Sequence, residues 1–180
     1  DVFEAGLSVS FSQPQQFPVI IQIDESFITE VNANEADSVS LFMDGNLIKK
    51  VAGEYLTDTI YAVDFGKFLI KTTAENETGT VADSFYFHVR PEVTIEPLPA
   101  GIRDGINYTG NQTALLSLFA PYKEFIYVIG DFNDWDITQD HYMKRTPDGQ
   151  HFWLEIDGLI PGKEYVFQYF IDGQIKVGDP

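Results

Sequence analysis

The chain consists of short runs of alternating apolar residues, and most of these runs end in a turn rich in Gly, Asp, Asn or Pro. In Val81–Val89, Phe85 and Phe87 alternate with Tyr86 and His88, which is the two-residue period of a β-strand. Two other runs flank the sequence Asp-Gly-Asn, whose glycine can adopt the positive φ of a tight hairpin. No stretch repeats with the period of a helix. The sequence therefore predicts an all-β fold.

The predicted strands fall into two groups, separated by a proline-rich stretch at residues 90–101. About seven short strands with frequent turns precede this stretch, a pattern typical of an immunoglobulin-like sandwich. Residues 24–37 are polar and acidic, and no strand is predicted there. The prolines cannot donate to a β-ladder, so they indicate a stiff connection between two domains. We predict two tandem immunoglobulin-like (early-set) β-sandwiches, residues 1–90 and 91–180. The predicted strands are 7–11, 19–23, 38–43, 47–51, 59–63, 67–74, 81–89, 114–119, 125–129, 142–145, 152–156 and 165–171.

The charge and composition exclude several classes of partner. The formal net charge is −17, which argues against nucleic acid or an anionic membrane, because phosphate contacts need clustered Lys and Arg. The absence of cysteine excludes disulfides and thiol catalysis. No apolar run approaches the roughly 20 residues of a membrane-spanning helix. We expect neither a nucleic-acid partner nor a membrane span.

No residue pattern predicts catalysis or a cofactor. The three histidines are not spaced as metal ligands. An acidic cluster after residue 130 could supply oxygen ligands to calcium, but its spacing is not that of an EF-hand, and Asp favours turns for local reasons. Two small sandwiches rarely offer the cleft that glycoside hydrolysis requires. We therefore assign no catalytic residue, no metal ligand and no cofactor. The residues considered were His88, His141, His151, Asp131, Asp134, Asp136 and Asp140.

Two tryptophans are candidates for surface recognition. In Ile126–Trp135, IYVIGDFNDW, a short apolar strand ends at Gly130 and is followed by a polar turn that Trp135 closes. An aromatic residue at such a position either plugs the end of a sandwich or offers a ring face to a sugar. In Phe152–Ile156, the apolar alternation predicts an inward face that excludes Trp153, so we expect Trp153 to point outward.

The motifs of the second half resemble carbohydrate-binding module family 48. The series FAPYKEFIYVIGDFNDW, HFWLEIDGLIPGKEYVFQYFIDG and DP is similar to that family over about Gln112–Pro180. The family includes the N-terminal early-set domain of glycoside hydrolase family 13 enzymes and the glycogen-binding domain of AMP-activated kinase β subunits. The segment PLPAGIRDGINY resembles the start of such a module in α-amylase-like proteins of Bacteroidetes. The first domain resembles the additional immunoglobulin-like domain that precedes the module there.

The resemblance also implies candidate carbohydrate-binding residues. Trp135 matches the tryptophan that stacks on glucose in glycogen-binding members. The position of a second stacking tryptophan is occupied by Ile175, and that of a sugar-binding lysine by Gln168. The candidates are Trp135, Trp153 and Gln168. In the hydrolases an Asp-Pro pair leads into a (β/α)8 barrel, so Asp179-Pro180 resembles the point at which the chain would enter that barrel.

The function implied by this resemblance is that of a non-catalytic N-terminal region of an α-amylase-family glycoside hydrolase acting on starch, glycogen or pullulan. The region would brace its own downstream catalytic barrel and bind α-glucan weakly, so the parent protein, and not this stretch, would be the enzyme. The resemblance implies export to the periplasm, the cell surface or the medium. The alternative is a tandem immunoglobulin-like surface protein that binds other proteins.

Overall fold

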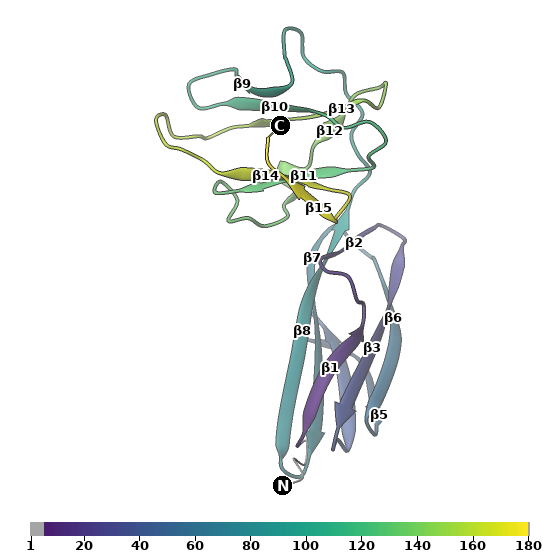
Figure 1. The fold of residues 1–180 in the computed structure, drawn as a ribbon. Coiled ribbons are helices and arrows are strands. Elements are labelled where there is room, and N and C mark those ends of the chain that lie inside the picture. The colour runs from purple at the N-terminus through teal and green to yellow at the C-terminus, as the bar shows by residue number, and fades with distance from the viewer. Residues whose placement is uncertain (1–5, 180) are drawn as a thin grey trace. The chain divides into compact units, whose positions relative to one another are not determined.

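The computed structural model describes residues 6–179 of the chain (Figure 1). Within these residues every element is a β-strand except one short 3-10 helix, η1 (Gln139–His141). The chain divides into two compact units, Asp1–Pro91 and Glu92–Pro180. Each unit is a β-sandwich with immunoglobulin-like strand order. The predicted fold class, an all-β chain with two tandem immunoglobulin-like sandwiches, is confirmed.

The first unit consists of a three-stranded and a five-stranded sheet, with strand orders β1-β3-β6 and β2-β8-β7-β4-β5 among the described residues. β2 pairs with β8 in parallel, and the other pairs in this unit are antiparallel. The strand ranges are β1 (Ser8–Gln13), β2 (Val19–Gln22), β3 (Ser26–Asn34), β4 (Ser38–Met43), β5 (Asn46–Ala52), β6 (Tyr55–Tyr61), β7 (Gly66–Asn76) and β8 (Gly79–Arg90).

In the first unit, β3 is the strand that the sequence pattern did not predict. Its buried positions are Thr29 and Val31, and Phe27 and Ala33 pack against the same core, so its apolar face contains only two large side chains. The buried Thr29 is tolerated because its hydroxyl donates to the carbonyl of Asp58 at 3.1 Å. The polar composition of residues 24–37 therefore hid a central strand.

The second unit also has two sheets, with strand orders β12-β13-β10-β9 and β11-β14-β15 (Figure 1). When the strands from β9 to β15 are lettered A to G in chain order, the two sheets are A-B-E-D and C-F-G, as in constant-type immunoglobulin domains. The pattern missed the two short edge strands β9 and β15, which contribute few apolar residues. The ranges are β9 (Gly105–Tyr108), β10 (Ala114–Phe119), β11 (Ile126–Gly130), β12 (Lys144–Arg145), β13 (His151–Ile156), β14 (Phe167–Ile171) and β15 (Ile175–Val177).

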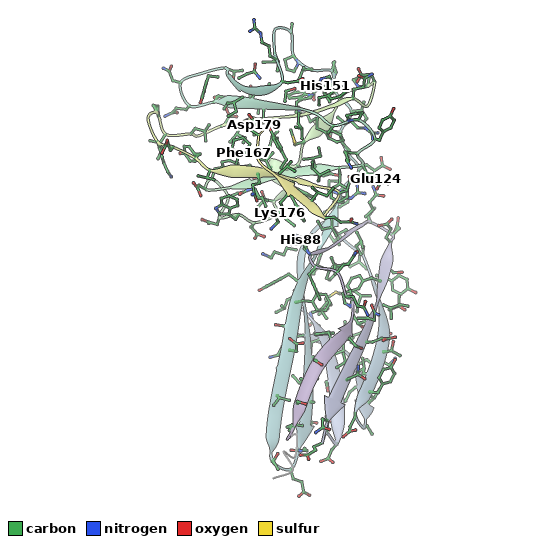
Figure 2. All side chains as sticks on the ribbon, viewed as in Figure 1. His88, Glu124, His151, Phe167, Lys176 and Asp179 are labelled. Carbon is green, nitrogen blue, oxygen red and sulfur yellow. The ribbon has the colours of Figure 1, made fainter. Side chains whose placement is uncertain are left out.

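The core of the second unit lies between these sheets and includes a buried tyrosine. Phe152, Met143 and Tyr169 are fully buried in it. The hydroxyl of Tyr169 donates to a carboxylate oxygen of Asp179 at 3.0 Å, and burial raises the pKa of this phenol. Asp179 lies between the two sheets, close to the start of β9 (Figure 2). This hydrogen bond connects the exposed Asp179 to a buried tyrosine of the core.

Candidate functional site

The candidate site is the corner that follows β11, and Gly130 makes its geometry possible. A Cβ atom at Gly130 would lie 2.5 Å from the carbonyl oxygen of Val166 and 2.7 Å from the Cβ of Phe167. Both distances are far shorter than a van der Waals contact. The end of β11 can therefore approach the start of β14 this closely only because residue 130 is glycine.

Asp131 joins the two sides of this corner through one carboxylate. Its backbone N–H donates to the carbonyl of Val166 at 3.0 Å, and the N–H of Val166 donates back to Asp131 Oδ2 at 2.9 Å. The other oxygen, Oδ1, accepts a hydrogen bond from the indole Nε1 of Trp135 at 3.0 Å. Asp131 thus links the tryptophan to the chain that enters β14.

Asn133 closes the turn on the other edge of β11. Its side-chain oxygen accepts from the N–H of Gly130 at 2.8 Å, and its amide nitrogen donates to the carbonyl of Val128 at 2.9 Å. The carbonyl of Gly130 in turn accepts from the N–H groups of Asn133 and Trp135. The backbone groups that the strand leaves unpaired at its end are satisfied inside the turn.

Trp135 is held in an unusual backbone conformation and stays accessible. Asp134 and Trp135 have φ values of 53° and 60°, in the left-handed region that non-glycine residues seldom adopt. The side chain of Trp135 is 42% exposed. Strained backbone conformations cluster at functional sites. Here such a conformation carries a large aromatic side chain that solvent can reach.

A second aromatic residue of the same loop packs inward. The ring of Phe132 stacks on His141 of η1, with centroids 4.9 Å apart and planes 19° apart, and also contacts the core. The Nδ1 of His141 lies 2.8 Å from the hydroxyl of Thr138, and burial lowers the pKa of His141. The loop therefore has a packed inner side, Phe132, and an accessible outer side, Trp135.

Gln168 lies on β14, near the Trp135 corner. It pairs with Ile129 of β11, and it faces away from the core that its neighbours Phe167 and Tyr169 contact. Val166, which Asp131 binds, precedes it by two residues. Ile175 pairs with Ile171, at the far end of β14. Ile171 lies about 13 Å along the strand from Phe167, at roughly 3.3 Å per residue.

Trp153 lies outside the core cluster that Phe152, Leu154 and Ile156 form, as the alternation predicted, but it is not open to solvent. Its side chain is only 4% exposed, because residues 94–96 run alongside β12 and cover that face of the sheet. The indole Nε1 donates to the carbonyl of Glu96 at 3.1 Å, and the ammonium of Lys144 lies 4.4 Å from the ring centroid. Lys144 also bonds Glu96 at 2.7 Å. Burial withdraws this ring from contact with a ligand in solution.

A groove of about 570 Å³ opens elsewhere in the second unit, and no sequence pattern predicted it. The N–H of Leu159 donates to the carbonyl of Gln112 at 2.9 Å and ties together the two loops that form its walls. The groove is separate from the Trp135 ring, which is not part of its lining. Its lining includes Tyr108, Leu116, Phe132, Ile156, Tyr165 and Phe167.

Ser117, Asp104 and His151 come together on the outer face of the four-stranded sheet, but not as a nucleophilic triad. His151 Nε2 lies 3.3 Å from Asp104 Oδ1, and the hydroxyl of Ser117 donates to the same oxygen at 3.4 Å. In a hydrolase triad the histidine lies between the hydroxyl and the carboxylate. Here the carboxylate lies between the other two, so His151 cannot accept the proton of Ser117.

The acidic residues of the loop do not converge as metal ligands. Within residues 6–179 no three His, Asp or Glu side chains lie close enough to hold a metal ion. Asp131 is engaged by Trp135 and Val166, and Asp136 Oδ1 accepts from the N–H of Ile137 at 2.9 Å. The acidic character of this stretch thus reflects turn formation.

The described part of the chain has no helix of the length and apolar character that a membrane crossing requires.

Comparison with known sequences places part of the chain near a glucan-processing enzyme. No known family profile matches the chain. A stretch of 79 residues, 42% of the chain, is 33% identical to a 1,4-α-glucan branching enzyme of Aquifex aeolicus. The chain spans 12% of the length of that relative. The similarity supports a β-domain of the kind that accompanies glycoside hydrolases.

Solved structures with similar folds were also found, at low identity. The fibronectin(III)-like modules of Clostridium thermocellum CbhA align over 94% of this chain and 88% of theirs, with 14% identity and a TM-score of 0.44. The apo structure of Bacteroides uniformis β-glucuronidase 3 aligns over 97% of this chain and 25% of its own, with 11% identity and a TM-score of 0.40. Both TM-scores are below 0.5, so neither likeness carries an argument about function.

Proposed function

We propose that this chain is a non-catalytic N-terminal region of an exported α-amylase-family glycoside hydrolase, and that its second unit contacts α-glucan through Trp135. The second unit is then a module like those of carbohydrate-binding family 48, and it also braces a downstream catalytic barrel. The similarity to a branching enzyme supports the enzyme family. The first unit is an additional sandwich, to which we assign no catalytic residue.

The observation that carries the glucan-binding part is the presentation of the Trp135 ring. The turn fixes Trp135 at its backbone N–H and at its indole N–H, while 42% of the side chain stays accessible. An aromatic ring fixed before the ligand arrives stacks on a sugar with a smaller loss of side-chain entropy. Gln168 lies on the face of β14 that is turned away from the core and can add hydrogen bonds to sugar hydroxyls.

The affinity of this site is expected to be low. Gln168 replaces a charged donor with a neutral amide, and a hydrogen bond from a charged group is worth roughly twice a neutral one. Ile175 offers no aromatic ring at the second stacking position. Each missing contact removes about 1 kcal/mol, so we expect dissociation constants near the millimolar range.

Titration of the chain with maltoheptaose, followed by tryptophan fluorescence, tests the proposal. Because Trp153 is buried, a response to sugar reports mainly on Trp135. Trp135→Ala removes this reporter, so its affinity is measured by titration calorimetry, and it should be at least tenfold lower than that of the wild type. The matched control is Tyr108→Ala, which removes another exposed aromatic ring of the second unit and should bind like the wild type.

The proposal fails if the wild type gives no response at millimolar maltoheptaose. It also fails if folded Trp135→Ala binds as well as the wild type. A loss in Tyr108→Ala alone would assign the ligand to the groove and not to the corner. The brace and export proposals are tested separately, by whether the parent gene encodes a signal peptide upstream and a barrel with Asp and Glu at its strand ends downstream.

A protein-binding role is the second candidate, because apolar side chains are exposed at the end of β6. Tyr61, Val63 and Phe65 are all exposed, and Ile28 lies diagonal to Tyr61 on the same sheet face. Neighbouring exposed apolar residues are typical of interaction surfaces. Self-association measured by light scattering should then fall in Val63→Asp, and a monomeric wild type would count against homotypic binding.

A further inference from the structure

The Asp131 carboxylate makes contacts that are more than local turn chemistry. It accepts one hydrogen bond from an indole four residues ahead and another from a backbone N–H 35 residues ahead. Each oxygen has a different donor, at 3.0 Å and 2.9 Å. A side chain with one acceptor oxygen at this position, such as an amide or a hydroxyl, could not give each donor an oxygen of its own.

These contacts determine which part of Trp135 a ligand can meet. The indole N–H is the only hydrogen-bond donor of the side chain, and it is already used by Asp131. The ring therefore has no further N–H to donate, and what it can offer a ligand is apolar carbon surface. A ligand that contacts Trp135 must offer a flat apolar face, because no donor remains on the ring.

The backbone also depends on this link. Asp134 and Trp135 both adopt positive φ, and such conformations persist only where neighbouring contacts over-determine them. The indole bond to Asp131 and the backbone bond from Trp135 N–H to the Gly130 carbonyl supply two such contacts.

We infer that Asp131 is the positioning residue of the site: it fixes the Trp135 ring so that the site takes pyranosides by stacking on their C–H faces. The inference rests on the proposed function for its ligand, but its structural part can be tested without one. Asp131 acts through Trp135, since each of its two oxygens already accepts a hydrogen bond from the protein, one of them from the indole.

The first experiment measures hydrogen exchange of the Trp135 Nε1–H by NMR in the absence of sugar. Asp131→Ala should accelerate this exchange at least tenfold. Asp131→Asn, which keeps the size but has one acceptor oxygen, should also accelerate it. The matched control is Asp134→Asn, which removes one negative charge from the same turn and suits a positive φ, and it should exchange like the wild type.

The second experiment asks whether Asp131 acts through the indole. In the wild-type background Asp131→Ala should weaken maltoheptaose binding about tenfold. In a Trp135→Phe background, where the ring remains but its N–H is absent, the same substitution should change affinity less than twofold. A general loss of folding would instead weaken both backgrounds equally.

Unchanged Nε1–H exchange in Asp131→Ala and Asp131→Asn would overturn the positioning role. Equal losses of affinity in the two backgrounds would overturn action through the indole. If the wild type does not bind maltoheptaose, the proposed function and the ligand part of this inference fail together, and the exchange experiment still decides whether Asp131 fixes the ring.

Discussion

Single residues in the GDFNDW corner have distinct physical tasks. Gly130 permits a close backbone approach, Asp131 links two segments, and Asn133 satisfies the end of β11. Phe132 packs inward and Trp135 stays accessible. The corner can therefore persist for structural reasons alone, and Trp135 is its exposed aromatic residue.

Replacing Gly130 with alanine should destabilise the second unit by about 3 kcal/mol, since the new Cβ meets backbone atoms that cannot move aside. Denaturant unfolding measures this cost. Gly178→Ala is the control, because a Cβ there meets nothing within 4 Å, and it should stay within about 0.5 kcal/mol of the wild type. Equal stability of the two variants would contradict the close approach.

His141 should make the corner sensitive to acid. Burial lowers its pKa below the ordinary 6.5, an effect that the nearby Asp140 partly offsets. The unfolded chain then binds more protons than the folded one below pH 6.5, so stability falls as the pH falls through this range and levels off below the folded pKa. Unfolding free energies between pH 8 and pH 5 should show this component, and His141→Gln should lack it. An identical pH dependence in both proteins would refute it.

At the scale of elements, residues 94–96, which precede β9, pair with Arg145 of β12 and become part of the second sandwich. The N–H of Arg145 donates to the carbonyl of Thr94, and the N–H of Glu96 donates to the carbonyl of Arg145, both at 2.9 Å. The segment was predicted as a stiff connection, and its prolines fit that description. Its contacts with β12 and Trp153 also make it a cover for one sheet face.

Trp153 should therefore behave as a core residue. Trp153→Ala should cost about 3–5 kcal/mol of unfolding free energy, as truncation of a buried aromatic does. Trp153→Phe keeps most of the packing but loses the bond to Glu96, and should cost about 1 kcal/mol. Tyr108→Ala removes a side chain that is 82% exposed, so it should hardly change the unfolding free energy. A neutral Trp153→Ala would show that the cover does not form.

At the scale of the whole molecule, each unit has its own core. The buried cluster of the first unit centres on Val31, Leu41 and Ile70, and that of the second on Val128, Phe152 and Tyr169. The two clusters share no residue. Units of this length bury enough surface to fold without disulfides.

Residues 1–91 and 92–180, produced separately, should each unfold in one cooperative transition. A core of its own allows each unit to be stable without the other. Calorimetry of each fragment measures this, with the full chain as reference. A fragment that lacks a cooperative transition would show that its core depends on the other unit.

The sequence determined the features that depend on neighbours along the chain. Alternation in β4 and β8, and turn residues such as Gly45, specify strands and hairpins because side-chain direction and φ are local properties. The GDFNDW turn is local too, so its position could be predicted from the chain, whereas the exposure of its tryptophan came from the structure. β3 was missed because its inward face uses threonine and alanine.

The tertiary structure decided which faces are buried and which side chains meet. Trp153 has polar neighbours in sequence, yet it is covered by Glu96, 57 residues earlier. Asp131 looks like an ordinary turn residue until β14 brings Val166 beside it. The groove also needs two loops that only strand pairing brings together. Contacts between distant segments depend on the register of the sheets, which the local pattern of one strand does not specify.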